Sequence, residues 1–373
     1  MGILAPSAGL AAALLAQDAA AAPPGACLLR RSWRAYERGF IQRDGRVIDR
    51  ADHDVTTSEG QAYALHRAVW IDDRRAFDRL LRWTRDNLQG GEPTALPAWR
   101  WGQRDDGTWG VIDPNPAADA DVWMAHALLA AADQWGDPAY RDQAVGLIAT
   151  VWEEEVAQVG PWRVLLPGPW ARDEHPIPVN PSYWFFPAFR AFAAVDPGHP
   201  WMELVDHGYA LLGAWMAGHR LPPDWAHLDP DSGVRLPDPA HRPESAIYGF
   251  EAMRVPLNLA ADVAWFDETR GRALLVTFAH LGRRWRADGR LAARMHADGS
   301  PAVDYEHPAL YGALLPAWGV GRPDDADALY QRHLDPLLRR GRWGDPDDYY
   351  AQNLVWQGIA LWTGIATAPE VRP

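Results

Sequence analysis

Apolar residues recur at helical spacing along most of this chain, and that periodicity constrains the fold more than any other feature. Val122, Ala125, Leu128, Leu129 and Ala132, for example, repeat at intervals of three and four residues, which places them on one face of a helix. Stretches that alternate every second residue and are rich in Val, Ile and Thr are scarce. The sequence therefore predicts an all-α fold.

These periodic segments predict about twelve helices. They are expected at residues 29–40, 58–70, 73–88, 120–135, 138–157, 181–193, 199–217, 245–260, 268–287, 305–318, 323–339 and 346–363. Gly136 followed by Asp137 and Pro138 is typical of one helix ending and the next beginning, and so short a turn joins two antiparallel helices. Twelve helices taken in pairs favour a closed toroid of six helical hairpins, an (α/α)6 barrel.

Two long proline-rich connections, residues 159–180 and 218–244, interrupt the helical pattern. Loops of this length in a compact domain are usually functional, so we expect them on a substrate-binding rim. No segment has the composition of a linker that would divide the chain. We therefore predict a single catalytic domain over residues 28–373.

The first 26 residues are predicted to be an export signal. An apolar Ala/Leu stretch at residues 9–16 is followed by small residues up to Ala26, as in a signal peptide. The usual positive residues at the start are missing, so a disordered Ala/Pro tail is the alternative. No later apolar run reaches the roughly 18 residues that a membrane span requires. These features predict a periplasmic or secreted protein without a membrane span.

The composition favours a neutral carbohydrate ligand. A formal net charge of −13 argues against nucleic acid or an anionic membrane surface, because both attract clustered Lys and Arg. The chain has 21 Trp, and indole faces suit the C–H faces of sugar rings, although Trp also fills cores.

No cofactor or metal is predicted. The sequence has neither a Walker-type loop nor a G-x-G-x-x-G motif. Cys27 is the only cysteine, so an internal disulfide and a multi-thiolate metal site are both excluded. His53, His66 and His126 lack the spacing of metal ligands. The absence of G-x-S-x-G also disfavours a serine hydrolase.

Two acids stand at the starts of strongly apolar helices, Glu59 in Ser-Glu-Gly-Gln and Asp119 in Ala-Asp-Ala-Asp. Acids so placed at neighbouring helix starts suggest acid chemistry on a neutral polymer. A general acid must keep its proton near neutral pH, whereas a helix start favours the ionised form. We expect Asp119 to raise the pKa of Glu59, since two carboxylates in one site cannot both ionise cheaply. Asp121 is predicted to be an N-cap of its helix.

Several motifs, taken in order, resemble glycoside hydrolase family 8. They are residues 58–61 (Ser-Glu-Gly-Gln), 97–102 (Pro-Ala-Trp-Arg-Trp-Gly), 117–121 (Ala-Ala-Asp-Ala-Asp), 165–169 (Leu-Leu-Pro-Gly-Pro), 180–183 (Asn-Pro-Ser-Tyr) and 252–255 (Ala-Met-Arg-Val). Within the family, the chain is most similar to the periplasmic endoglucanases of bacterial cellulose synthase operons, for which Gly-Arg-Val-Ile-Asp at residues 45–49 is also typical. The resemblance spans roughly residues 33–363.

The resemblance implies an (α/α)6 barrel and inverting hydrolysis of a β-1,4-linked glucan or a related polysaccharide, with the cellulose synthase machinery as a possible partner. By position, Glu59 matches the general acid and Asp119 the aspartate that binds the sugar beside the scissile bond. The family also implies substrate-binding roles for Arg254, Tyr183 and, as a stacking platform, Trp101.

The general base is where the chain departs from the family. An aspartate usually precedes the Ala-x-Arg-Val segment, but here that position holds Glu251. Glu251 is the expected base, and the alternatives are another rim acid (Asp229, Asp238 or Glu244) or weak turnover. The corresponding alternative functions are hydrolysis of another β-glycan, such as xylan, chitosan or mixed-linkage glucan, and a glycan-binding accessory with weakened catalysis.

Overall fold

Helices form most of the structure, a computed structural model that describes residues 25–236 and 247–370. The α-helices are α1 (Ala26–Phe40), α2 (Ser58–Trp70), α3 (Arg74–Asn87), α4 (Ala118–Trp135), α5 (Pro138–Glu155), α6 (Phe186–Val195), α7 (Trp201–Trp215), α8 (Arg254–Phe266), α9 (Thr269–Leu275), α10 (Ala279–Asp288), α11 (Pro308–Gly321), α12 (Pro323–Leu329) and α13 (Tyr349–Trp362). The mainly helical fold predicted from the apolar periodicity is confirmed.

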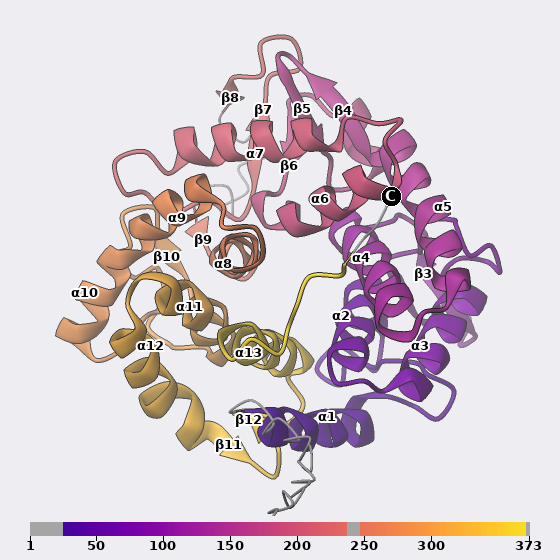
Figure 1. Ribbon diagram of the computed structural model, residues 1–373, viewed down its shortest axis with the longest axis horizontal. Helices are drawn as coiled ribbons and strands as arrows, with labels where there is room; N and C mark the ends of the chain where they lie inside the picture. The colour runs from indigo at the N-terminus through magenta and orange to yellow at the C-terminus, as the bar shows by residue number, and fades with distance from the viewer. Residues whose placement is uncertain (1–24, 237–246, 371–373) are drawn as a thin grey trace, which may run out of the picture.

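Helices α2, α4, α6, α8, α11 and α13 lie nearest the middle of the molecule (Figure 1), and each packs against the next. Helix α2 contacts α4, α4 contacts α6, α6 contacts α8, α8 contacts α11, α11 contacts α13, and α13 contacts α2. Figure 1 shows α1, α3, α5, α7, α10 and α12 further out. The buried apolar residues form one cluster that extends from Leu29 to Ala366.

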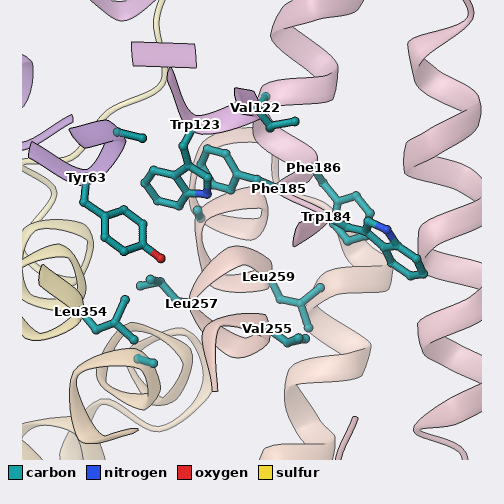
Figure 2. Packing of buried hydrophobic residues seen from close by; sticks show 14 of the residues in the cluster. Tyr63, Val122, Trp123, Trp184, Phe185, Phe186, Val255, Leu257, Leu259 and Leu354 are labelled. Carbon is teal, nitrogen blue, oxygen red and sulfur yellow. The ribbon is translucent and has the colours of Figure 1, made fainter. Parts of the chain in front are cut away.

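Aromatic rings fill part of the space between the central helices (Figure 2). Tyr63 of α2 meets Trp123 of α4 edge to face at 5.5 Å, and Trp123 stacks on Phe185 at 4.4 Å. Leu257 of α8 points into the same cluster. These contacts fix the positions of α2, α4 and α8 relative to one another, and all three helices begin beside the acids described below.

Short strands connect the helices. They are β1 (Thr56–Thr57), β2 (Arg100–Gln103), β3 (Trp109–Asp113), β4 (Val156–Val159), β5 (Trp162–Leu165), β6 (Ile177–Val179), β7 (Ala226–Leu228), β8 (Arg235–Leu236), β9 (Ile247–Tyr248), β10 (Met295–His296), β11 (Leu338–Arg339) and β12 (Arg342–Trp343). Strands β1, β2 and β3 form one antiparallel sheet, and β6, β7 and β8 another. Strands β5, β6, β7 and β8 lie within the two long connections at residues 159–180 and 218–244.

Four of the expected helices differ from the structure. In the segment expected to be helical at 181–193, residues 181–183 form a 3₁₀ turn and α6 begins only at Phe186. The segment 245–260 was expected to be helical throughout, but residues 247–248 form β9 and α8 begins only at Arg254. The expected helix at 268–287 is divided into α9 and α10 by a 3₁₀ turn, and the one at 323–339 leaves α-helical geometry after Leu329. The segment 323–339 contains Pro336. The nitrogen of a proline ring carries no hydrogen, so it cannot donate a helical hydrogen bond.

The predicted turn between α4 and α5 is confirmed. Gly136 has a φ of 63° and ends α4, Asp137 accepts a hydrogen bond from the backbone of Ala139, and Pro138 opens α5. Helix α1 starts at Ala26, two residues before the predicted domain boundary. The expected signal segment lies outside the described residues except for its last two positions. Within residues 25–236 and 247–370, no helix is long and apolar enough to cross a membrane.

Candidate active site

The start of helix α2 presents Glu59. Thr57, the last residue of β1, caps the helix by accepting a hydrogen bond from the Gly60 N–H at 3.0 Å. Pairing of Thr56 with Trp101 and of Thr57 with Arg100 fastens this corner to the β2–β3 hairpin. Because the Thr57 hydroxyl already accepts the hydrogen bond from the Gly60 N–H, the Glu59 carboxyl is available for other contacts.

Arg254, the first residue of α8, connects all three predicted catalytic acids. Its Nη1 lies 2.8 Å from Glu59 Oε2 and 2.6 Å from Asp119 Oδ2, and its Nη2 binds Glu251 Oε2. The Arg254 side chain is 6% exposed. Residues that are 195 and 135 positions apart from Arg254 thus meet around one buried guanidinium. The structure brings Glu59, Asp119, Glu251 and Arg254 together.

Glu251 is held through one of its two carboxylate oxygens. Asn180 donates its side-chain N–H to Glu251 Oε2 at 3.0 Å, and Arg254 donates to the same atom. Among the described residues, we find no hydrogen bond to Glu251 Oε1. The Glu251 side chain is 33% exposed, compared with 19% for Glu59 and 7% for Asp119. Glu251 is therefore the acid of the three that water reaches most easily.

The protonation of Glu59 follows from its surroundings. The pKa of the Glu59 carboxyl is raised to about 7, chiefly by burial; the Arg254 guanidinium lowers it, and the carboxylates of Asp119 and Glu251 raise it. Asp119 therefore acts in the expected direction, but burial is the larger cause. Burial also raises the pKa of Asp119, although Arg254 and the Ala120 N–H, at 2.8 Å, favour its ionised form.

Two tyrosine hydroxyls complete the surroundings of Glu59. Tyr349 of α13 donates to Glu59 Oε1 at 3.0 Å, and Tyr63 donates to Oε2 at 3.4 Å. Tyr63 also accepts from Arg254 Nη1 at 3.2 Å. Neither tyrosine was predicted as a member of the site. Tyr63 follows Glu59 by four positions on one helix, so its contact could have been predicted, whereas Tyr349 is 290 positions away.

Of the other two predicted residues, Tyr183 lies at this site and Trp101 lies beside it. The Tyr183 ring centroid is 5.3 Å from the Arg254 guanidinium carbon. Trp101 stacks against Trp109 at 5.4 Å, and the Arg46 guanidinium lies 4.3 Å from the Trp101 ring centroid. Trp109 is 46% exposed. In this stacked pair, Trp109 offers the larger accessible face.

The alternative candidates for the general base are Asp229, Asp238 and Glu244. Asp229 accepts hydrogen bonds from the backbone N–H groups of Asp231 and Ser232 and from the Ser232 hydroxyl, so its carboxylate holds a local turn. Asp238 and Glu244 lie outside the described residues. We therefore keep Glu251 as the candidate base, because it is the one that shares Arg254 with the candidate acid.

Asp121 is not an N-cap as predicted, because α4 begins at Ala118 and Asp121 is its fourth residue. The Asp121 side chain is completely buried and interacts with Glu155, the last residue of α5. Burial raises the pKa of Glu155 to about 8 and that of Asp121 well above its usual range. Both side chains are fully buried, so this pair is a feature of the core.

The histidines form no metal site in the described part of the chain. His66 Nε2 lies 2.9 Å from His126 Nδ1 in the aromatic core, and burial lowers the pKa of His126 to about 3. Among residues 25–236 and 247–370, no group of three or more His, Cys, Asp or Glu side chains is arranged to hold a metal ion.

Comparison with known proteins places this arrangement in a family. The sequence profile of glycosyl hydrolases family 8 matches residues 4–317. The chain belongs to glycosyl hydrolases family 8. An endoglucanase of Pseudomonas fluorescens is 40% identical over 199 residues, which are 52% of this chain and 50% of the relative. An endoglucanase of Escherichia coli is 37% identical over 228 residues, which are 60% of each protein. These matches thus span about half to three fifths of the curated relatives.

A solved structure extends the family likeness over more of the fold. The endo-1,4-D-glucanase of Vibrio fischeri superimposes with a TM-score of 0.77 at 28% identity, and the match covers 88% of this chain and 93% of that one. The family resemblance predicted from the sequence motifs is confirmed.

Proposed function

We propose that the protein is an inverting endo-β-1,4-glucanase that hydrolyses cellulose or a soluble β-glucan. The observation that carries this proposal is the placement of Glu59 and Glu251 on different nitrogens of the Arg254 guanidinium, with the pKa of Glu59 raised to about 7. An acid that holds its proton near neutral pH and a solvent-accessible carboxylate are the two groups that glycoside hydrolysis requires.

In the proposed reaction, Glu59 protonates the glycosidic oxygen as the bond to the anomeric carbon breaks. Glu251 takes a proton from the water whose oxygen bonds to that carbon from the opposite face. Asn180 and Arg254 hold Glu251 Oε2, which leaves Oε1 to face the water. Inverting enzymes keep the two carboxyls about 6.5 to 9.5 Å apart, and a guanidinium between Glu59 and Glu251 is compatible with that range.

The remaining site residues bind substrate in this proposal. Asp119 accepts a hydrogen bond from the sugar next to the scissile bond, Arg254 and Tyr183 line the same position, and Trp101 with its neighbour Trp109 offers a stacking surface. The names of the relatives support a glucan substrate. Xylan, chitosan and mixed-linkage glucan are the alternative substrates, and a weakly catalytic glycan-binding accessory is the alternative function.

We also propose that the domain is a closed (α/α)6 barrel over residues 28–373. The sequence of contacts from α2 through α4, α6, α8, α11 and α13 back to α2 supports this architecture, and so does the single buried cluster from Leu29 to Ala366. The apolar segment at residues 9–16 and the polymeric substrate support a periplasmic or secreted location. A role beside a cellulose synthase rests on the motif at residues 45–49.

The test combines a substrate panel with variants of both acids. Reducing-sugar release should be greatest on carboxymethyl cellulose or soluble cello-oligosaccharides, compared with xylan, chitosan and mixed-linkage glucan. Glu59→Gln should lower kcat by about 10² to 10⁴, the usual contribution of general acid catalysis, while cellopentaose still quenches tryptophan fluorescence. Glu251→Ala should be nearly inactive, whereas Glu251→Asp should keep a measurable rate.

Proton NMR of the first products should show the α-anomer. An initial β-anomer would exclude the inverting mechanism, and an active Glu251→Ala protein would exclude Glu251 as the base. A parent protein that binds cellopentaose without cleaving any of the four polymers would be an accessory.

A further inference from the structure

The backbone that carries Glu251 is held by a buried aspartate on the connection between α7 and β7. Asp224 is 3% exposed. Its Oδ1 accepts hydrogen bonds from the Gly249 N–H and from the Ala252 N–H, both at 2.8 Å. These two donors lie on either side of Glu251 in the chain. A single carboxylate oxygen therefore binds the backbone both before and after the candidate base.

Further hydrogen bonds hold Asp224 and the turn at residues 249–252 in place. The Asp224 N–H donates to the Ile247 carbonyl at 2.7 Å, which joins the backbone of Asp224 to β9. On the other side, the Tyr350 hydroxyl donates to the Phe250 carbonyl. The turn then continues into α8, because the Arg254 N–H donates to the Glu251 carbonyl at 3.1 Å.

Gly249 permits this approach of Asp224. A Cβ at position 249 would lie 2.6 Å from Asp224 Oδ2 and 3.3 Å from Arg294 Nε, and the first of these distances is too short for a real contact. A methyl group at position 249 would therefore have to displace the Asp224 carboxylate from its place beside the turn.

We propose that Asp224 is a positioning residue that sets the placement of the Glu251 carboxylate through the turn at residues 249–252. This inference rests on the proposed role of Glu251 as the base. A glutamate has one more rotatable bond than an aspartate, so a fixed backbone matters more for aiming its carboxylate at the attacking water. A misplacement of about 1 Å at a reacting group can cost up to about 10²-fold in rate.

The experiment measures kcat and KM on cellopentaose for Asp224→Ala, Asp224→Asn and Gly249→Ala. Asp224→Ala should lower kcat about 10- to 100-fold, with KM and the cellopentaose titration changed less than about 3-fold, because the sugar-binding groups keep their places. Asp224→Asn retains an oxygen that can accept both N–H groups, so its kcat should recover most of that loss. Gly249→Ala should reproduce the loss while leaving residue 224 intact.

Two matched controls separate positioning from general damage. Asp298→Ala removes an exposed aspartate that accepts the backbone N–H of Ser300, in a turn whose hydrogen-bond donors do not flank Glu251. Gly213→Ala adds a methyl group where nothing lies within 4 Å. Both should match the parent protein. In a Glu251→Ala background, adding Asp224→Ala should change the residual rate less than about 2-fold, since residues that act through one group are not additive.

The outcomes distinguish the inference from the proposed function. An inactive parent, or an active Glu251→Ala, contradicts the proposed function or its base. An active parent with an inactive Glu251→Ala and a fully active Asp224→Ala overturns the inference alone. Equal loss in Asp224→Asn and Asp224→Ala, or full additivity with Glu251→Ala, would also overturn it. If Asp224→Ala fails to fold by circular dichroism, Gly249→Ala and Asp224→Asn decide.

Discussion

One arginine governs the chemistry of the site, because it contacts every acid that the proposed reaction uses. Arg254 meets Glu59 and Asp119 through Nη1 and Glu251 through Nη2. Burial is the largest cost of ionising Glu59, and the carboxylates of Asp119 and Glu251 add to it, because one positive charge cannot offset three negative ones. The proton that Glu59 retains near neutral pH is the result.

Tyr349 opposes this effect, and its removal gives a prediction at the residue scale. The Tyr349 hydroxyl donates to Glu59 Oε1 and thereby lowers the pKa of Glu59. Since a general acid works only when protonated, kcat/KM of the parent should fall as pH rises through about 7. Tyr349→Phe removes the donor, so this alkaline limb should move to higher pH.

The pH dependence of kcat/KM for cellopentaose hydrolysis measures where the activity falls as pH rises. Tyr305→Phe, which alters a tyrosine that is 47% exposed, is the control and should keep the parent profile. A limb that moves to lower pH in Tyr349→Phe would contradict the account of Glu59.

At this scale, the sequence predicted four residues that the structure brings together. Glu59 and Asp119 were singled out by their places at helix starts, and Glu251 and Arg254 through the family resemblance, while the roles of all four stay predictions. Asp224 and Tyr349 were missed, because a buried carboxylate or phenol far away in the chain gives no local signal of its partner.

At the scale of secondary structure, the periodicity of apolar residues located the long helices. It failed where side-chain contacts override the helical preference of the local sequence. The hairpin of β4 and β5 was missed, although Val156–Val159 and Trp162–Leu165 pair residue by residue. Gly160, with a φ of 54°, makes the tight turn between them. The late start of α8 has a comparable cause, since the carboxylate of Asp224 holds residues 249–252 in a turn.

The contact of α4 with α5 contains a buried acid pair that should make stability depend on pH. Burial raises the pKa of Glu155 to about 8 and that of Asp121 well above its usual range, whereas in the unfolded chain both ionise near pH 4. Between these values the folded protein binds more protons than the unfolded one, so stability declines as pH rises.

The neutral double variant Asp121→Asn, Glu155→Gln should therefore lose less in Tm between pH 5 and pH 8 than the parent, by several degrees. Thermal unfolding at the two pH values measures the difference. Glu153→Gln alters an exposed acid of the same helix and should behave as the parent does. Parallel pH slopes in the double variant and the parent would refute the prediction.

On the scale of the whole molecule, the segment after α13 ties the central helices together at the end of the described chain. The Trp70 indole N–H donates to the Thr367 carbonyl and the Trp265 indole N–H to the Ala366 carbonyl, both at 3.2 Å. Ala366 is buried and lines a small apolar cavity among these rings. In Figure 1 this yellow segment crosses the middle of the molecule.

Ending the chain after Gly364 should lower Tm by about 3 to 8 °C, because each lost hydrogen bond contributes roughly 1 kcal/mol and the aromatic rings become exposed. Differential scanning calorimetry measures the shift. A chain ended after Glu370 keeps these contacts and is the control. An unchanged Tm in the shorter chain would show that the segment holds nothing in place.

In the proposed reaction, the charges around Arg254 also affect which polymer segments can be cut. With Glu59 protonated, the carboxylates of Asp119 and Glu251 outnumber the one guanidinium that contacts them among the described residues, so a glucan bound there would meet a field that repels anions. Carboxymethyl groups on the two sugars flanking the cleaved bond are disfavoured for this reason. Digestion of carboxymethyl cellulose should accordingly stop at a limit set by the spacing of unsubstituted sugars, and the final fragments should lengthen as the degree of substitution rises.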